Sequence, residues 1–219
     1  MKDGNTAAPL DRKSLAIAAK SVASIDKDFA RILEKHGPPP LWEREPDFVT
    51  LIRIILEQQV SLASADAMFQ RLKKNIEPLS PTTIIAAGEP FLRSFGVTRQ
   101  KAAYFINVAQ AIQNGELDLD ALGLESDETA IEKLTSIKGI GQWTAKIYLL
   151  MALRRPDVWP VGDVALATAF KNLKGRSKRP SQSELSEIAK AWSPHRATAA
   201  RMLWHYYLTA MQDNIGNDP

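Results

Sequence analysis

The sequence predicts an all-α fold of about ten helices. Apolar side chains recur three or four residues apart in nearly every segment, and capping residues or helix breakers separate these segments. No run of useful length alternates between apolar and polar residues, as a half-buried strand would. We therefore expect helices packed on helices and no sheet.

In the N-terminal half, the first helix is expected over residues 15–33 and ends before Gly37, which three prolines follow. Asp47 opens the next helix, which is apolar nearly all round and is therefore expected to be buried. Further helices are expected over residues 61–75, 80–88 and 98–114, each opened by a serine or threonine cap and closed near an asparagine or glycine.

In the C-terminal half, helices are expected over residues 126–137 and 144–154, with Gly139-Ile140-Gly141 between them. The later helix starts are marked by Val164, by Ser181 with Glu184 as a capping box, and by Ser193-Pro194.

The charge balance is mild overall but uneven along the chain. Twenty-eight lysines and arginines face 25 acidic residues, a net charge of +3. Residues 138–201 hold twelve basic and four acidic residues, so this stretch alone carries 12 − 4 = +8. An excess of this sign suits a polyanion such as nucleic acid, although solvated helix faces produce similar counts.

The chain has no cysteine, which excludes disulfides, thiolate zinc sites and a cysteine-ligated iron–sulfur cluster. Its three histidines do not cluster, so a histidine-based metal enzyme is not expected either. No secretion leader opens the sequence, and no apolar run is long enough to span a bilayer. We expect an intracellular protein that does not associate with membranes.

The most informative stretch covers residues 134–146, Leu-Thr-Ser-Ile-Lys-Gly-Ile-Gly-Gln-Trp-Thr-Ala-Lys. It predicts two helices joined by a tight turn in which Gly139 and Gly141 flank one aliphatic residue. Glycine allows a positive φ and a close backbone approach. The amides after the turn begin the second helix, where unpaired N–H groups and the helix dipole favour a phosphate.

This stretch resembles the helix-hairpin-helix of the helix-hairpin-helix/Gly-Pro-Asp superfamily of DNA glycosylases. The family's Gly/Pro-rich loop and aspartate should follow about twenty residues downstream, and Trp159-Pro-Val-Gly-Asp163 stands there. Residues 55–61, Ile-Leu-Glu-Gln-Gln-Val-Ser, resemble the family's early helix end, and residues 192–204 resemble the C-terminal helix of the 3-methyladenine DNA glycosylase II type. The resemblance covers roughly residues 45–210.

The resemblance implies two helical subdomains with the active-site cleft between them. One is a contiguous helical barrel over residues 45–155, which includes the hairpin. The other combines residues 1–44 with residues 156–219 and carries the aspartate loop. The all-helical pattern leaves no room for the N-terminal β domain of many bacterial relatives, so we expect the compact form, acting as a monomer.

The resemblance also implies that Asp163 is the catalytic residue, whose carboxylate stabilises the positive charge that develops on the sugar. Taken alone, an aspartate before Val164 is a good helix N-cap, and both roles are compatible. Trp143 and Trp204 correspond to aromatic pocket positions for a cationic base, with core packing as the alternative. The other three tryptophans, Trp42, Trp159 and Trp192, are interpreted as structural.

DNA contacts are implied at two places. Gln58 and Gln59 correspond to the residues that enter the gap left by the extruded nucleotide, although they can equally cap a helix end. The hairpin residues implied to bind a phosphate are Gly139, Gly141 and Thr144 through their main-chain N–H groups, with Lys138 and Lys146 as flanking cations. Main-chain carbonyls of the hairpin, those of Thr135, Ile137 and Ile140, are the implied ligands of a monovalent cation, Na⁺ or K⁺.

The sequence thus predicts a monofunctional DNA glycosylase that removes alkylated purines such as 3-methyladenine and 7-methylguanine from double-stranded DNA in base excision repair. Members that also cut the strand carry a lysine where Trp143 stands, and Lys146 lies nearly one helical turn away. Two alternatives remain open: a glycosylase for other damaged or deaminated bases, and a non-catalytic DNA-binding module. The basic run over residues 171–179 is interpreted as a solvated loop.

Overall fold

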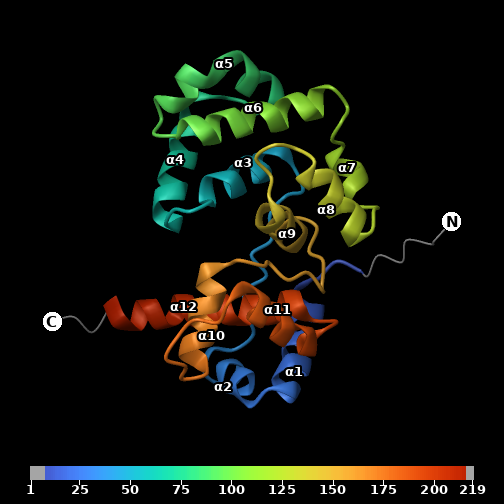
Figure 1. The fold of residues 1–219 in the computed structure, drawn as a ribbon, viewed down its shortest axis with the longest axis vertical. Helices are drawn as coiled ribbons and strands as arrows, with labels where there is room; N and C mark the ends of the chain where they lie inside the picture. Colours follow the sequence, from blue (N-terminus) through green and yellow to red (C-terminus); the bar gives the residue numbers. More distant parts are fainter. Residues whose placement is uncertain (1–7, 216–219) are drawn as a thin grey trace. The chain divides into compact units, whose positions relative to one another are not determined.

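The computed structural model describes residues 8–215, which form twelve α-helices and one short 3₁₀ helix (Figure 1). No strand occurs among these residues, so the predicted all-α class is confirmed. The described chain divides into two compact units, one over residues 44–153 and one that joins residues 8–43 to residues 154–215. No helix in the described part is long and apolar enough to cross a membrane.

The unit over residues 44–153 is built around helix α3. Seven of the ten residues of α3 are buried. Neighbouring helices α4, α6 and α9 pack against it, as its apolar circumference predicted. The helices of this unit are α3 (Phe48–Glu57), α4 (Leu62–Asn75), α5 (Pro81–Arg93), α6 (Arg99–Gln113), α7 (Leu119–Leu122), α8 (Asp127–Thr135) and α9 (Gln142–Met151).

A buried lysine fixes the C-terminal end of α3. The Nζ atom of Lys101, on α6, donates a hydrogen bond of 2.6 Å to the carbonyl oxygen of Leu56. A cation is favourable there because the last carbonyls of a helix carry partial negative charge. Burial nevertheless lowers the pKa of Lys101 below 10.5, since the ammonium loses solvation. Lys101 therefore supplies a buried hydrogen-bond donor to a carbonyl in the last turn of α3.

The second unit packs around the long C-terminal helix. Its helices are α1 (Arg12–Ile25), α2 (Lys27–His36), α10 (Val164–Leu173), α11 (Gln182–Ala189) and α12 (Arg196–Ile215), with the 3₁₀ helix η1 (Lys190–Trp192) before α12. Helices α1, α2 and α10 contact α12. Trp192 lies buried with its ring 5.1 Å from Phe29 and 5.4 Å from Trp159, so the structural interpretation of Trp192 is confirmed. Trp159 is buried against the same ring, and it also lines the pocket beside Asp163 that is described below.

The expectation of one helix over residues 15–33 is wrong, because the chain breaks at Asp26. The backbone of Asp26 is extended (φ −137°, ψ 114°), and its side chain accepts a hydrogen bond from the amide of Asp28. Lys174 donates to both aspartates at 2.7 Å. The aspartate thus starts a new helix where apolar spacing alone indicated continuity.

Two other expectations need small corrections. Gly88 interrupts its helix as a kink (φ 69°, ψ 165°), and helical turns resume through Pro90 to Arg93. The short helix α7 was missed, because four residues carry too little periodicity to be detected.

The start of α12 is held by a half-buried ion pair. Arg196 donates from Nε and Nη2 to the two carboxylate oxygens of Asp157, each at 2.9 Å. Ser193 and the amide of Arg196 donate to the same carboxylate. Burial tends to raise the pKa of Asp157, but the hydrogen bonds from Arg196 and Ser193 outweigh it and hold the pKa below 3.8.

We predict that Asp157→Asn lowers the free energy of unfolding by about 1–3 kcal/mol near neutral pH, because a charge-assisted bidentate contact is lost. A depressed carboxyl pKa contributes stability that is complete above the unfolded value of about 3.9 and is lost as pH falls below it. Urea unfolding of both proteins should therefore give curves that converge toward about pH 2.

Glu184→Gln serves as the control. It removes the more exposed pair with Arg176 and should change stability much less than Asp157→Asn does. A difference between wild type and Asp157→Asn that stays constant down to the acid limit would contradict this assignment.

Candidate DNA-binding hairpin and catalytic aspartate

The hairpin joins α8 to α9 through residues 136–141. Gly139 has φ +112°, and a Cβ atom there would lie 2.4 Å from Cγ of Tyr104 on α6. Both the backbone angle and the tyrosine ring therefore require glycine at this position. Gly141 is different, because its φ is −89° and a Cβ atom would meet nothing within 4 Å.

Gly141 is the N-cap of α9, and no side chain caps this helix. Where the N-cap residue of a helix has an acceptor side chain, that side chain accepts a main-chain N–H. Ser126 does so at the start of α8. The first turn of α9 thus combines uncapped amides with open space above Gly141. This is the geometry in which a helix N-terminus accepts an anion such as a phosphate.

Gln58 ties the end of α3 to both sides of the hairpin. Its Nε2 atom donates to the carbonyl of Gly139 at 3.1 Å and to Oγ1 of Thr144 at 2.9 Å. The side chain of Thr144 is buried in this contact. The side-chain amide of Gln58 thus holds the hairpin and does not cap α3, and its contact with DNA stays a prediction.

Gln59 follows in a conformation that is rare for a residue with a side chain. It is exposed and has φ +56°, in the left-handed region. Such strain typically persists where the surrounding structure enforces it, often at functional sites. Val60 and Leu62 beside it are 40% and 61% exposed, so the loop after α3 presents a polar tip flanked by apolar side chains.

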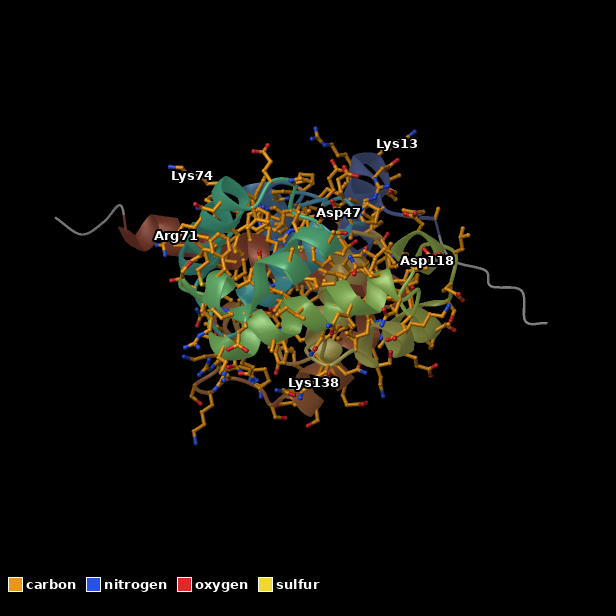
Figure 2. All side chains as sticks on the ribbon, turned by 90° about the horizontal axis from the view of Figure 1, so that it is seen from above. Lys13, Asp47, Arg71, Lys74, Asp118 and Lys138 are labelled. Atoms are coloured by element: carbon orange, nitrogen blue, oxygen red, sulfur yellow. The ribbon has the colours of Figure 1, made fainter. Side chains whose placement is uncertain are left out.

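The two hairpin lysines differ in exposure. Lys138 is exposed in the turn, and its carbonyl accepts a hydrogen bond from Asn107 at 3.1 Å. Figure 2 shows its side chain at the periphery of the molecule. Lys146 is half-buried on α9, as is Trp143 in the first turn of that helix. These residues all belong to the unit over residues 44–153.

Thr135 is the last residue of α8, and Ile137 and Ile140 lie in the turn that follows it. Their carbonyl oxygens match a monovalent cation chemically, because hard cations prefer oxygen ligands. The carbonyl of Ile137 accepts the amide of Ile140 at 3.0 Å. Since a carbonyl oxygen has two lone pairs, this bond leaves it able to bind a cation as well. No cluster of three or more histidines and carboxylates suited to a metal occurs among residues 8–215.

Asp163 belongs to the other unit and is the N-cap of α10. Its Oδ1 atom accepts the amide of Leu166 at 2.9 Å and Nε1 of Trp204, on α12, at 3.4 Å. Gly162 before it has φ +86°, which places the loop in the left-handed region that glycine tolerates. Asp163 is half-buried and Trp204 is 8% exposed. The cap interpretation is thus confirmed, and two donors fix the direction of the carboxylate.

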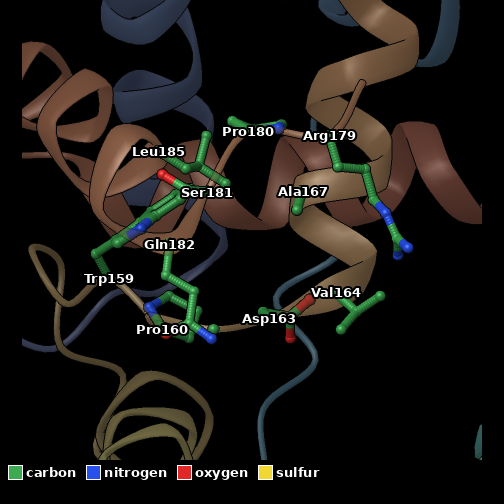
Figure 3. Close-up of a pocket in the computed structure, with 11 residues that line it drawn as sticks. Trp159, Pro160, Asp163, Val164, Ala167, Arg179, Pro180, Ser181, Gln182 and Leu185 are labelled. Atoms are coloured by element: carbon green, nitrogen blue, oxygen red, sulfur yellow. The ribbon is translucent and has the colours of Figure 1, made fainter. Parts of the chain in front are cut away.

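A pocket of about 280 Å³ adjoins this carboxylate (Figure 3). Its walls come from the Asp163 loop, the first turns of α10 and the start of α11. Residues on different sides of it include Asp163, Ala167, Arg179 and Gln182. The volume is close to the lower limit for a small-molecule site.

Trp42 was predicted to be structural. Its ring lies beside that of Trp204. The two ring centroids lie 6.4 Å apart at an angle of 71°. Trp42 has φ +47°, which is unusual for so large a side chain. Arg201, fully buried, donates to the carbonyl of Leu41 at 2.9 Å and so anchors the chain just before Trp42. Only the three prolines before it hinted at a constrained backbone.

Comparison with known proteins gives consistent results. A sequence model of the family described as "HhH-GPD superfamily base excision DNA repair protein" matches residues 52–195. The chain is 28% identical to DNA-3-methyladenine glycosylase 1 of Schizosaccharomyces pombe, a match that covers 87% of each protein. It is also 28% identical to the putative DNA-3-methyladenine glycosylase YfjP of Bacillus subtilis, over 80% of this chain and 64% of that protein.

Among solved structures, the chain is similar to the 3-methyladenine DNA glycosylase Mag1 of S. pombe in complex with abasic DNA. The TM-score is 0.80 at 27% identity, over 86% of this chain and 95% of that one.

We predict that Gly139→Ala destabilises the protein by about 1–3 kcal/mol or more, because a positive φ and the ring of Tyr104 both oppose a methyl group. Gly141→Ala is the matched control two residues away. Its surroundings accept a methyl group, so it should cost only the roughly 1 kcal/mol or less by which alanine is a poorer N-cap than glycine. Urea unfolding of the two variants checks this, and equal destabilisation would show that the close packing at Gly139 is wrong.

Proposed function

Since the chain belongs to the HhH-GPD superfamily of base excision DNA repair proteins, we propose that it is a DNA glycosylase that hydrolyses the N-glycosidic bond of alkylated purines. The relatives that it matches include proteins named for 3-methyladenine and for alkylated bases. Its partner is double-stranded DNA that contains such a base. It acts as a monomer, in the cytoplasm or nucleoid, or in a nucleus.

The observation that carries this proposal is the fixed carboxylate of Asp163. A glycosylase extrudes its target nucleotide, and positive charge develops on the deoxyribose as the bond to the base breaks. A carboxylate that is already oriented stabilises this charge without reorganising during the reaction. The amide of Leu166 and the indole of Trp204 provide that orientation, because both donate to Oδ1.

The leaving group explains why a single acid suffices. A purine alkylated at N3 or N7 is cationic before the bond breaks, so it departs without a strong general acid. Aromatic faces bind such a base through stacking and cation–π attraction. We assign this role to Trp143 and Trp204, and the water that completes hydrolysis is oriented by Asp163.

DNA is held through its backbone by the hairpin. The N–H groups of Gly139, Gly141 and Thr144 bind one phosphate, and the uncapped start of α9 supports this role. Lys138 and Lys146 add salt-dependent attraction. When Na⁺ or K⁺ is bound by the carbonyls of Thr135, Ile137 and Ile140, it adds positive charge next to that phosphate.

Gln59 fills the gap that the extruded nucleotide leaves. Its exposed position and its strained backbone favour Gln59 over Gln58, whose amide group is already bound to the hairpin. Gln58 then acts on DNA indirectly, by holding the hairpin against the end of α3.

The central test is the release of free 3-methyladenine and 7-methylguanine from alkylated duplex DNA. Asp163→Asn keeps acceptors for Leu166 and Trp204 but removes the charge, so the rate should fall by about 100-fold or more while DNA binding persists. The matched control is Asp11→Asn, which changes another N-cap aspartate of the same unit, on α1. The control should retain full activity.

Release that is equally fast in Asp163→Asn would remove the catalytic role of this acid. No release of any damaged base by the wild type, with intact DNA binding, would instead indicate a non-catalytic DNA-binding module. Release confined to other damaged or deaminated bases would change the substrate class and leave the mechanism in place.

We further predict that the enzyme does not cut the DNA strand. Trp143 stands at the position where strand-cleaving relatives carry the lysine that forms a Schiff base, and Trp143 has no amine. Borohydride should therefore trap no covalent complex between the protein and abasic DNA. A trapped complex that Lys146→Ala abolishes would overturn this prediction.

A further inference from the structure

The basic run over residues 171–179 contains cations in two different situations. Lys174 is bound to Asp26 and Asp28, and Arg176 pairs with Glu184 at 2.6 Å. Arg179 is exposed and forms no ion pair with any residue that the structure describes. The first two cations are occupied by the protein's own acids, and the charge of Arg179 is available to a ligand.

Arg179 stands at the pocket beside Asp163. Both residues line the same pocket of about 280 Å³. Figure 3 shows the side chain of Arg179 extending along α10 toward the edge that carries Val164, with Ala167 at the opposite edge. Val164 is the residue directly after Asp163, and it is 62% exposed although it is apolar. A cation and an exposed apolar side chain therefore line the same pocket as the carboxylate.

The backbone of Arg179 is constrained. Pro180 follows it and is buried, and Ser181 then caps α11 by accepting the amide of Glu184. A residue before proline is restricted to extended conformations. The loop therefore restricts the backbone of Arg179, and less backbone entropy is lost when this residue binds a partner.

We propose that Arg179 binds a phosphate of the DNA strand whose deoxyribose faces Asp163, as a second phosphate contact in addition to the hairpin. This inference rests on the proposed function. A guanidinium matches the two free oxygens of a phosphodiester with two parallel hydrogen bonds. Val164 contacts the sugar between that phosphate and Asp163. The arginine also offsets the repulsion between the phosphate backbone and the carboxylate.

The test measures the salt dependence of DNA binding with a fluorescent duplex that carries one tetrahydrofuran abasic-site analogue. Each phosphate contact contributes about 0.9 to the slope of log Kd against log salt concentration. Arg179→Ala should weaken binding several-fold and reduce this slope by about one. Arg179→Lys should largely retain the slope, because the charge is kept.

Arg176→Ala is the matched control, since it removes the same charge from the same loop at a position that is already paired. It should change the slope much less than Arg179→Ala does. Thermal unfolding checks that both variants are folded. An unchanged slope in Arg179→Ala, or equal reductions in Arg179→Ala and Arg176→Ala, overturns the assignment of Arg179. A wild type that does not bind the duplex at all overturns the proposed function, so the two failures are distinguishable.

Discussion

The carboxylate of Asp163 receives two N–H donors on one oxygen, and the proposed chemistry depends on that arrangement. The donor from Leu166 belongs to the first turn of α10, and the donor from Trp204 belongs to α12. Without these contacts the carboxylate would rotate, and water would solvate its charge. Here the helix cap, the indole and the left-handed Gly162 together keep the charge in one place before any substrate binds. Capping and catalysis therefore use the same geometry.

In the unit over residues 44–153, contacts within the protein likewise fix the geometry of a candidate site. Lys101 binds the carbonyl that ends α3, Gln58 reaches from there to the hairpin, and Tyr104 leaves room only for glycine at position 139. Each contact is made by the protein itself, and side chains from α3 and α6 hold the hairpin. Among the described residues, no side chain caps the first turn of α9.

The sequence predicted the helical class well, because capping residues and apolar spacing are local signals. The same signals failed at Asp26, where a cap outweighs continuous apolar spacing, and at α7, which is too short to show a period. The cap role of Asp163 was readable from Val164 and the residues that follow it.

Contacts between distant residues could not be read from one sequence. The approach of Tyr104 to Gly139, the amide of Gln58 on the hairpin and the ring of Trp42 beside Trp204 join residues that lie far apart in the chain. The burial of Lys101 and the lack of an ion pair between Arg179 and any described residue could not be predicted, for a related reason. Charge counts do not distinguish a buried cation or an unpaired one from a cation paired on the surface.

The account rests on an electrostatic claim, namely that Asp163 stabilises a cationic sugar. The most direct measurement compares the Kd of duplexes that carry a cationic pyrrolidine or a neutral tetrahydrofuran in place of the target nucleotide. Because transition-state analogues bind far more tightly than ground-state ligands, the wild type should prefer the cationic duplex by about 100-fold or more. Asp163→Asn should lose most of this preference. An equal preference in both proteins would contradict the claim.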